Sequence, residues 1–340
     1  DVSRGDSSAQ NKKDPQNLHI PGDVKVTQLL RSVVSRGFLY IFVLLAIGAL
    51  ITFDFDNGQL MLWFLLPFYV TGLLLQWIMP RKKVELERGE LVTDIVSNAF
   101  AFLLGHLQGL MATILFGLLS ASLLIHFGLL DPGFGLSNLP IWAQIMIGLL
   151  VFDFMFYCTH RAAHEIPFLW RFHSVHHRAH RVTLMNAYRV HPLDMVLRRF
   201  VPVFVLIQTG ISQEAFVGVA VIGSVFGTIT HLNVDLRHGF LNYIIGTNEM
   251  HRWHHSTVYS EAKNFGGFMV WDHMFGTFYK PKDREEPETI GLGNEDNYPI
   301  HNYWQMLMIP FRWNSLKQKP GEAPKVEPIE HDAPAVAQVK

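Results

Sequence analysis

The sequence predicts an all-α integral membrane protein: a helical bundle of about four spans plus a hairpin, with a cytoplasmic histidine-rich helical cap. Three observations lead to this prediction. Only 17% of the 340 residues are charged, against about 25% in an average soluble domain, while 49% are hydrophobic. Several uncharged runs approach or exceed the roughly 20 residues that cross a bilayer as a helix. Of the 18 histidines, many gather in three short clusters.

Four uncharged runs precede the histidine clusters, and we expect them to supply the four spans: residues 37–53, 57–80, 95–130 and 132–152. The third run is too long for one straight span, so part of it is expected to lie along the membrane surface. Arg31, Arg36 and the basic stretch 81–83 alternate with loops that lack Lys and Arg. The positive-inside rule then assigns the first histidines to the cytoplasmic side.

The segment from about 192 to 234 predicts the hairpin, with its apex at "QTGISQE". A later stretch, "NYWQMLMIPFRW", pairs an apolar face with two tryptophans, as an interfacial anchor does. Both ends of the chain are polar and predict disorder. We therefore divide the chain into a disordered N-terminal tail, N-terminal transmembrane helices, a catalytic domain, an interfacial segment and a disordered C-terminal tail, at 1–20, 21–138, 139–280, 281–315 and 316–340.

Composition and motifs argue against several functions. The net charge of −1 offers no basic surface for nucleic acid. Cys158 is the only cysteine, so neither a disulfide framework nor a thiolate metal site is expected. No G-x-G-x-x-G motif follows a strand pattern, which argues against a dinucleotide-binding domain.

The three clusters read "HRAAH", "HSVHH" and "HRWHH", and they contain His160, His164, His173, His176, His177, His251, His254 and His255. Residues three and four apart share one face of a helix, so each cluster directs its imidazoles toward one point. Pro167 is expected to end the first of these helices and to begin the next, so that two helix ends face one another. Two copies of H-x-x-H-H arise by chance in about one such chain in a thousand.

The eight cluster histidines exceed the four ligands of a tetrahedral zinc ion, so the sequence predicts two metal ions. Neutral nitrogen ligands suit iron, copper, zinc or nickel, whereas magnesium prefers carboxylates.

At these clusters the sequence resembles the fatty acid hydroxylase and sterol desaturase superfamily of membrane di-iron enzymes. The family signature is H-x(3,4)-H followed by two copies of H-x(2,3)-H-H, and "YRVHPLD" and "NFGGFMVWDHMFGT" match its other segments. The resemblance covers about residues 139–280. It implies two iron ions, O2 and attack on a C–H bond of a lipid, with the cluster histidines as ligands; zinc is possible in a purified form.

The resemblance extends to further histidines. His231 in "THLNV" matches a family histidine and is the ninth implied ligand, and His191 is a possible additional ligand. His180 and His273 are expected at the surface or behind the ligands.

Metal-bound histidines usually donate their second ring N–H to a carboxylate or carbonyl. We expect this supporting role for Asp153, Asn233, Glu249, Asn264 and Asp272. Asp153 is the most informative of them, because an acid inside an apolar span is costly. Helix capping or pairing with arginines is the alternative for each.

The lipid is expected to reach the metals through a slot lined by Phe152, Phe156, Phe226 and Ile229, although lipid-facing packing explains the same side chains. "HPLD" lacks the glycines of the haem motif H-P-G-G, so a separate donor is expected: ferredoxin, rubredoxin or cytochrome b5 with its reductase. A basic cytoplasmic face suits an acidic donor or anionic lipid, and positive-inside bias explains it equally well; its residues are Arg161, Arg171, Arg178, Arg181 and Arg189.

The first functional hypothesis is therefore a lipid hydroxylase in the membrane, with the bacterial inner membrane favoured over the endoplasmic reticulum. The alternative within the superfamily is a sterol or isoprenoid desaturase, a demethylase or an alkyl ether monooxygenase. A metal transporter is the hypothesis from a different class. Transporter sites lie near the bilayer midplane, whereas these clusters flank arginines beyond the spans.

Overall fold

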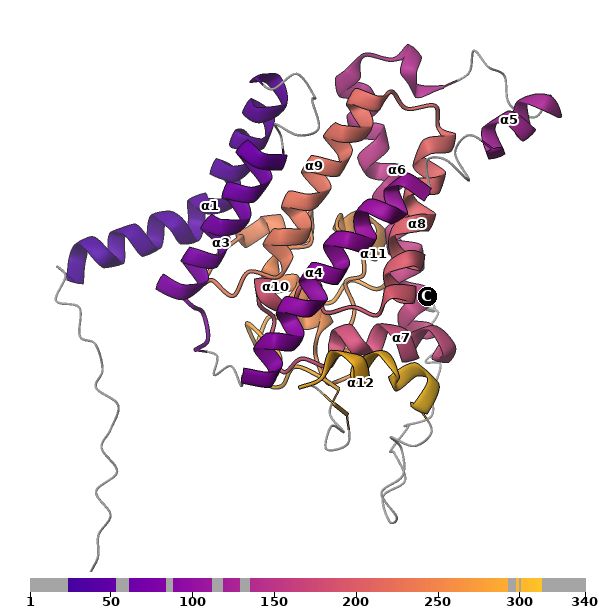
Figure 1. Ribbon diagram of the computed structural model, residues 1–340. Coiled ribbons are helices and arrows are strands. Elements are labelled where there is room, and N and C mark those ends of the chain that lie inside the picture. The colour runs from indigo at the N-terminus through magenta and orange to yellow at the C-terminus, as the bar shows by residue number, and fades with distance from the viewer. Residues whose placement is uncertain are drawn as a thin grey trace, which may run out of the picture.

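The computed structural model describes residues 24–52, 61–83, 88–111, 119–128, 135–292, 298–299 and 301–313. Every regular element within these ranges is helical, apart from isolated bridges between single residues (Figure 1). The predicted all-α class is confirmed for this part of the chain. The tails predicted at 1–20 and 316–340 lie outside the described residues.

The first half of the chain contains α1 (Val24–Thr52), a π-helical turn (Met61–Leu65), α3 (Leu66–Ile78), α4 (Arg88–Met111), α5 (Leu119–His126) and a 3-10 turn (Leu136–Asn138). The second half contains α6 (Ile141–Glu165), α7 (Pro167–His177), α8 (Pro192–Gln208), α9 (Gln213–Thr230), α10 (Asn248–His254), α11 (Met269–Met274) and α12 (Tyr303–Leu307). Short 3-10 turns complete it at Leu184–Asn186, Gly239–Tyr243 and Ile309–Arg312.

Two helices in the described ranges, α6 and α9, are long and apolar enough to cross a membrane. A third candidate is α1, which bends by 55° between Arg31–Phe38 and Tyr40–Ala49. The expectation of about four spans plus a hairpin thus exceeds the two or three candidates found here. Part of the difference has a simple origin, because residues 112–118 and 129–134 of the long apolar stretch lie outside the described residues.

Prolines set the ends of the helices that carry the first two histidine clusters. α6 follows Pro140 and ends at Glu165, and Ile166 is extended before Pro167 starts α7. Proline disfavours helical geometry in the residue before it and fits the first turn of a new helix. The predicted break at Pro167 is confirmed.

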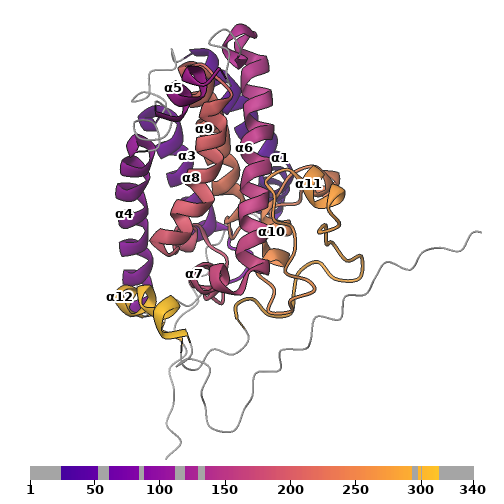
Figure 2. The same ribbon diagram turned by 90° about the vertical axis from the view of Figure 1, so that its right-hand side faces the viewer.

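The predicted hairpin is also confirmed, and it packs against α6. A turn over residues 209–212 joins α8 to α9, where Gly210 adopts a φ of 65° and Ser212 caps α9 by accepting a hydrogen bond from the Ala215 amide. α6 contacts both helices of the hairpin along its length (Figure 2). These three helices form the centre of the bundle.

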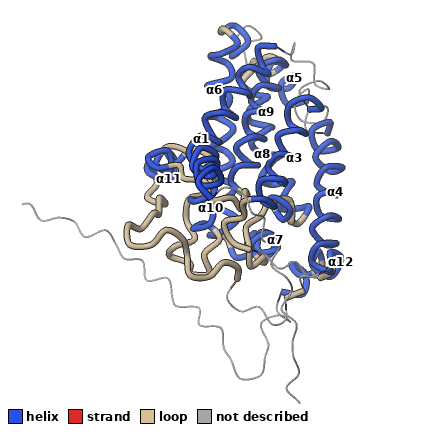
Figure 3. The backbone as a smooth tube through the Cα atoms, turned by 90° about the vertical axis from the view of Figure 1, so that its left-hand side faces the viewer, coloured by secondary structure: helices blue, strands red, loops and turns tan. Residues whose placement is uncertain are grey.

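One end of the bundle gathers the histidine-bearing segments. α7, α10 and α12 lie at the end opposite α5 (Figure 1), and the long loops of the second half collect there as well (Figure 3). In the predicted interfacial segment, Tyr303 and Met306 are buried whereas Trp304 and Phe311 are exposed. One face of this segment therefore packs against the protein, and the other exposes apolar side chains at the surface.

Five arginines were expected to form a basic surface, and this prediction is wrong for three of them, which are buried. Arg178, Arg181 and Arg189 are at most 9% exposed. Arg181 and Arg189 pair with Glu90 and Asp94 of α4, with Arg181 Nη2 2.9 Å from Asp94 Oδ2 and Arg189 Nε 2.7 Å from Asp94 Oδ1. Their charges compensate buried acids that are far away in the sequence, so they tie the segment between α7 and α8 to α4.

Replacing Asp94 with alanine is expected to lower the free energy of unfolding by about 3–5 kcal/mol, because it leaves two buried guanidinium groups, Arg181 and Arg189, with Glu90 as their one remaining acidic partner in this network. Asp235→Ala is the control, since Asp235 is half-exposed and pairs with Arg81 and Arg237 at the surface; its cost is expected below about 1 kcal/mol. Unfolding of the detergent-solubilised protein measures both. Equal stability of the two variants would contradict a structural role for the buried network.

Candidate metal centre

The break between α6 and α7 brings the first two histidine clusters together. His160 and His164 project from the last turns of α6, and His173 and His177 stand one turn apart on α7. His160 Nε2 lies 3.1 Å from His173 Nε2. α10 brings the third cluster to the same place, with His254 and His160 ring centroids 4.5 Å apart.

Nine histidines form two groups in which the candidate ligand atoms lie within 4.8 Å of one another. The five-histidine group contains His160, His164, His173, His177 and His254; the four-histidine group contains His176, His231, His251 and His255. These are the nine histidines that the sequence analysis selected, and His191 lies in neither group.

Helical phase explains how each H-x-x-H-H cluster divides between the groups. Residues four apart share a helix face, whereas the residue between them points to another side. His173 and His177 therefore join one group and His176 the other, while His251 and His255 join one group and His254 the other. The groups touch where the His177 and His255 rings stack, with centroids 4.2 Å apart.

The environment keeps these imidazoles neutral. Burial, together with the neighbouring imidazoles, lowers the pKa of His176, His177, His254 and His255 well below the ordinary value. A neutral ring nitrogen retains the lone pair that a metal ion requires. Protonation of so many adjacent rings would place several positive charges in a buried space.

Several ring nitrogens have no protein partner among the described residues. Buried nitrogens without a hydrogen bond include His164 Nε2, His176 Nδ1, His177 Nε2, His254 Nε2 and His255 Nδ1. Leaving a buried polar atom unsatisfied costs about 1–3 kcal/mol, so such atoms are rare in folded proteins. In the five-histidine group, a metal ion would satisfy the Nε2 atoms of His164, His177 and His254, and the all-imidazole set fits iron, zinc, copper or nickel.

Four of the grouped histidines are held by a hydrogen bond at their other ring nitrogen, and one of them is His231, whose Nδ1 lies 3.1 Å from Thr230 Oγ1. His160 Nδ1 donates to the Phe265 carbonyl oxygen at 2.8 Å, and His254 Nδ1 donates to the Lys263 carbonyl oxygen at 2.9 Å. His173 Nδ1 lies 3.1 Å from Asp194 Oδ2. Such bonds fix the tautomer, leaving Nε2 directed into the group.

Asp194 was missed by the sequence reasoning. It is buried, and Arg198 donates to the same carboxylate oxygen at 2.7 Å and 3.0 Å. The available signal was its place in "HPLD", where an acid in the first turn of a helix directly follows His191 and Pro192.

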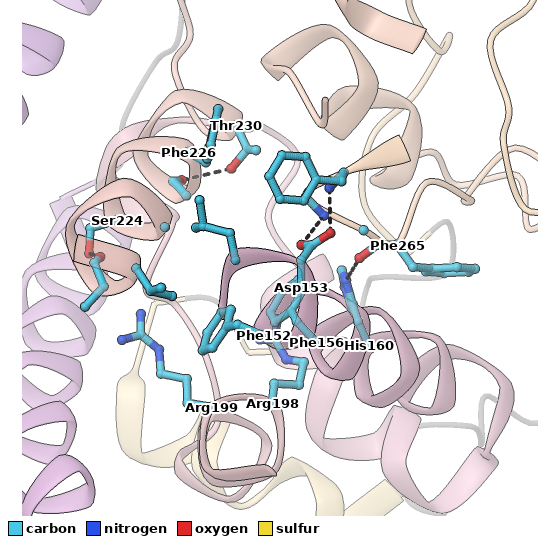
Figure 4. Close-up of a pocket in the computed structure, with 18 of the residues that line it drawn as sticks. Phe152, Asp153, Phe156, His160, Arg198, Arg199, Ser224, Phe226, Thr230 and Phe265 are labelled. Atoms are coloured by element: carbon cyan, nitrogen blue, oxygen red, sulfur yellow. Dashed lines mark hydrogen bonds between the residues drawn. The ribbon is translucent and has the colours of Figure 1, made fainter. Parts of the chain in front are cut away.

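The two aspartates expected behind the ligands contact backbone instead. Asp153 accepts hydrogen bonds from the amides of Gly267 and Phe268 at 2.8 Å and 2.7 Å (Figure 4). Asp272 accepts hydrogen bonds from the amides of Phe265 and Gly266 at 2.9 Å and 3.0 Å. Both acids therefore hold the loop that presents the Phe265 carbonyl to His160. They act on His160 through that loop, because the Phe265 carbonyl already occupies the second ring nitrogen of this histidine.

The other residues expected to support the histidines form hydrogen bonds with other groups instead. Asn233 bonds the backbone of Lys82, Glu249 accepts from Asn242, and Asn264 bonds the backbone of Tyr279. His191 caps α8 through Nδ1 and approaches the Leu307 carbonyl oxygen through Nε2 at 3.2 Å. His180 contacts Arg178, and His273 contacts the Tyr243 carbonyl.

Gly267→Ala is expected to weaken metal binding about 10-fold, within the range that supporting residues contribute. A Cβ atom at this position would lie 2.6 Å from Asp153 Oδ1, so the loop must shift away from the carboxylate. Gly227→Ala is the matched control, because a Cβ there meets nothing within 4 Å. Competition with a chelator measures both affinities, and equal values would show that the loop does not position His160.

A cavity of about 360 Å³ opens beside the histidines, between α6, α8 and α9. His160, His176, His231 and His251 line one part of it. Apolar side chains line the remainder, including Phe152, Phe156 and Phe226 as expected (Figure 4). The expectation for Ile229 is wrong, since this residue is 1% exposed in the core that α9 forms with α1 and α3.

The fatty acid hydroxylase family model matches residues 145–277, which contain all nine grouped histidines. The chain is 34% identical to the ornithine lipid hydroxylase OlsE of Rhizobium tropici, over 55% of this chain and 56% of that protein. It is 28% identical to an alkylglycerol monooxygenase of Caenorhabditis elegans, over 49% of this chain and 34% of that protein.

A putative Delta(7)-sterol-C5(6)-desaturase 2 of Arabidopsis thaliana is 28% identical over 40% of this chain and 48% of that protein. The chain thus spans about half the length, or less, of these curated relatives. No solved structure matches it.

Proposed function

The chain belongs to the fatty acid hydroxylase and sterol desaturase superfamily, and from this premise we propose that it is a di-iron hydroxylase that inserts oxygen from O2 into a C–H bond of a membrane lipid. The observation that carries the proposal is the pair of buried histidine groups beside an apolar cavity. The nine grouped histidines are the proposed ligands.

When bound, the iron pair would supply the redox chemistry that activates O2. In the overall reaction, one oxygen atom enters the C–H bond and the other leaves as water, with two electrons and two protons consumed. A separate donor supplies the electrons in this proposal: ferredoxin, rubredoxin or cytochrome b5 with its reductase. We place the histidine end of the bundle at the cytoplasmic face, in a bacterial inner membrane by preference.

The residues of the chain supply placement and exclusion of water. Phe152, Phe156 and Phe226 offer an apolar wall along which an alkyl chain can lie, with its reactive carbon toward His160 and His176. Asp194 and the Phe265 carbonyl hold the rings of His173 and His160 in fixed orientations. Fixed geometry of this kind is the contribution that a protein makes to cofactor chemistry.

A desaturase or alkyl ether monooxygenase is the second candidate, because an alkylglycerol monooxygenase and a putative sterol desaturase are among the relatives. A metal transporter receives less support, since the relatives named above are a hydroxylase, a monooxygenase and a desaturase.

Growth under ¹⁸O2 followed by lipid mass spectrometry tests the proposal. Cells that express the wild-type protein are expected to accumulate a lipid carrying one ¹⁸O atom, and cells that express His177→Ala are expected to lack it. Loss of two hydrogen atoms without label would favour the desaturase. Identical lipids in the two strains would contradict an oxidative function.

A further inference from the structure

Arg199 lies on α8 and lines the same cavity as the histidines. Its side chain extends from α8 toward the turn of α9 that carries Ser224 (Figure 4), and it is exposed. A guanidinium group and a candidate metal centre thus share one apolar cavity.

The Arg199 guanidinium has no acidic partner among the residues that the structure describes. It lies over the ring of Tyr188, whose centroid is 5.7 Å from Arg199 Cζ. The adjacent Arg198 differs, because both Nε and Nη2 donate to Asp194. Of these two neighbouring cations, Arg198 is neutralised by a buried carboxylate, whereas Arg199 has no carboxylate partner among the described residues.

The part of the cavity beside Arg199 offers it no acidic side chain among the described residues. The cavity wall near it is formed by apolar or small residues of α8 and α9, such as Val203, Ala220 and Gly223. The Ser224 hydroxyl already donates to the Ala220 carbonyl oxygen at 2.7 Å, so it does not compete with the guanidinium for an acidic group. A planar guanidinium beside an apolar cavity wall matches the geometry of a carboxylate or phosphate group on a ligand.

We propose that Arg199 binds the acidic group, a carboxylate or a phosphate, of the lipid substrate. The protein then selects amphiphiles with an anionic or zwitterionic head group, and Arg199 fixes the head group while the chain lies along the apolar wall toward the histidines. This inference rests on the proposed function, because it takes the cavity as the substrate site.

Binding of three oleoyl-chain probes to the full-length protein in phosphatidylcholine nanodiscs tests the proposal. Oleate carries a carboxylate, oleoyl lysophosphatidic acid carries a phosphate, and oleyl alcohol is neutral. The wild-type protein is expected to bind at least one acidic probe about 10-fold or more tightly than the alcohol, as charge-assisted hydrogen bonds predict. The preferred acidic probe distinguishes carboxylate from phosphate.

Arg199→Gln is expected to remove this preference while affinity for oleyl alcohol and metal content stay unchanged. Arg199→Lys keeps the charge without the planar donor pair and is expected to retain only part of the preference. Arg237→Gln is the control, because Arg237 is a half-exposed surface arginine paired with Asp235 and Glu285. Equal binding of all probes by the wild type, an unchanged preference in Arg199→Gln, or the same loss in Arg237→Gln would overturn the proposal.

The binding assay requires no turnover, so its failure is distinct from failure of the hydroxylase proposal. Labelled lipid without a head-group preference would remove the role of Arg199 alone. A head-group preference without labelled lipid would remove the hydroxylase alone.

Discussion

His176→Ala is expected to lose one of two bound metal ions and to lower turnover more than 100-fold, beyond the roughly 10–100-fold that supporting residues contribute. His176 belongs to the four-histidine group, so the substitution leaves three imidazoles there. His176 also lines the cavity, which places it beside the proposed substrate. The protein is expected to remain inserted in the membrane, because none of the three candidate spans contains this residue.

His191→Ala is the matched control for this loss. His191 is buried one helix turn from Asp194, yet it lies in neither histidine group and caps α8 instead. It is expected to retain both metal ions. Metal analysis of the purified variants, together with a turnover assay, compares the two substitutions. Full metal content and full activity in His176→Ala would refute the ligand assignment.

Asp194→Asn is expected to weaken metal binding to the five-histidine group about 10–100-fold. The carboxylate is the shared partner of His173 Nδ1 and of the Arg198 guanidinium, and its side chain is 1% exposed. An amide of the same shape removes the negative charge, so the orientation of His173 weakens and a buried cation loses its counter-charge.

Chelator competition on the purified protein measures the effect of Asp194→Asn. Glu165→Gln serves as its control, because Glu165 is an exposed acid at the end of α6 that pairs with Arg161. Wild-type affinity in Asp194→Asn would show that the carboxylate does not support the ligand.

Short sequence motifs were sufficient to predict several helix boundaries and to identify the histidines that come together. Pro167 fixed the junction of α6 and α7, and "QTGISQE" marked the turn between α8 and α9, because proline and glycine act on the backbone within a few residues. The spacing of H-x-x-H-H predicted that imidazoles converge, and helical phase accounts for their division into two groups.

Contacts between segments that are far apart in the sequence could not be predicted from such motifs. The Phe265 carbonyl meets His160 across 105 residues, and Arg189 meets Asp94 across 95 residues. Neither pairing follows from the local pattern around any of these residues. Asp153 illustrates the same point. Its position in an apolar stretch of sequence indicated a special role, but its hydrogen-bond partners, the backbone amides of residues 267 and 268, are known only from the packing of α6 against that loop.

The central claim is that two irons occupy the two histidine groups. The most direct test is elemental analysis of the purified protein combined with Mössbauer spectra after growth on iron-57. Two irons per chain with the signature of a coupled pair are the predicted result. One metal ion per chain, or two uncoupled zinc-type sites without iron after anaerobic handling, would contradict the di-iron account.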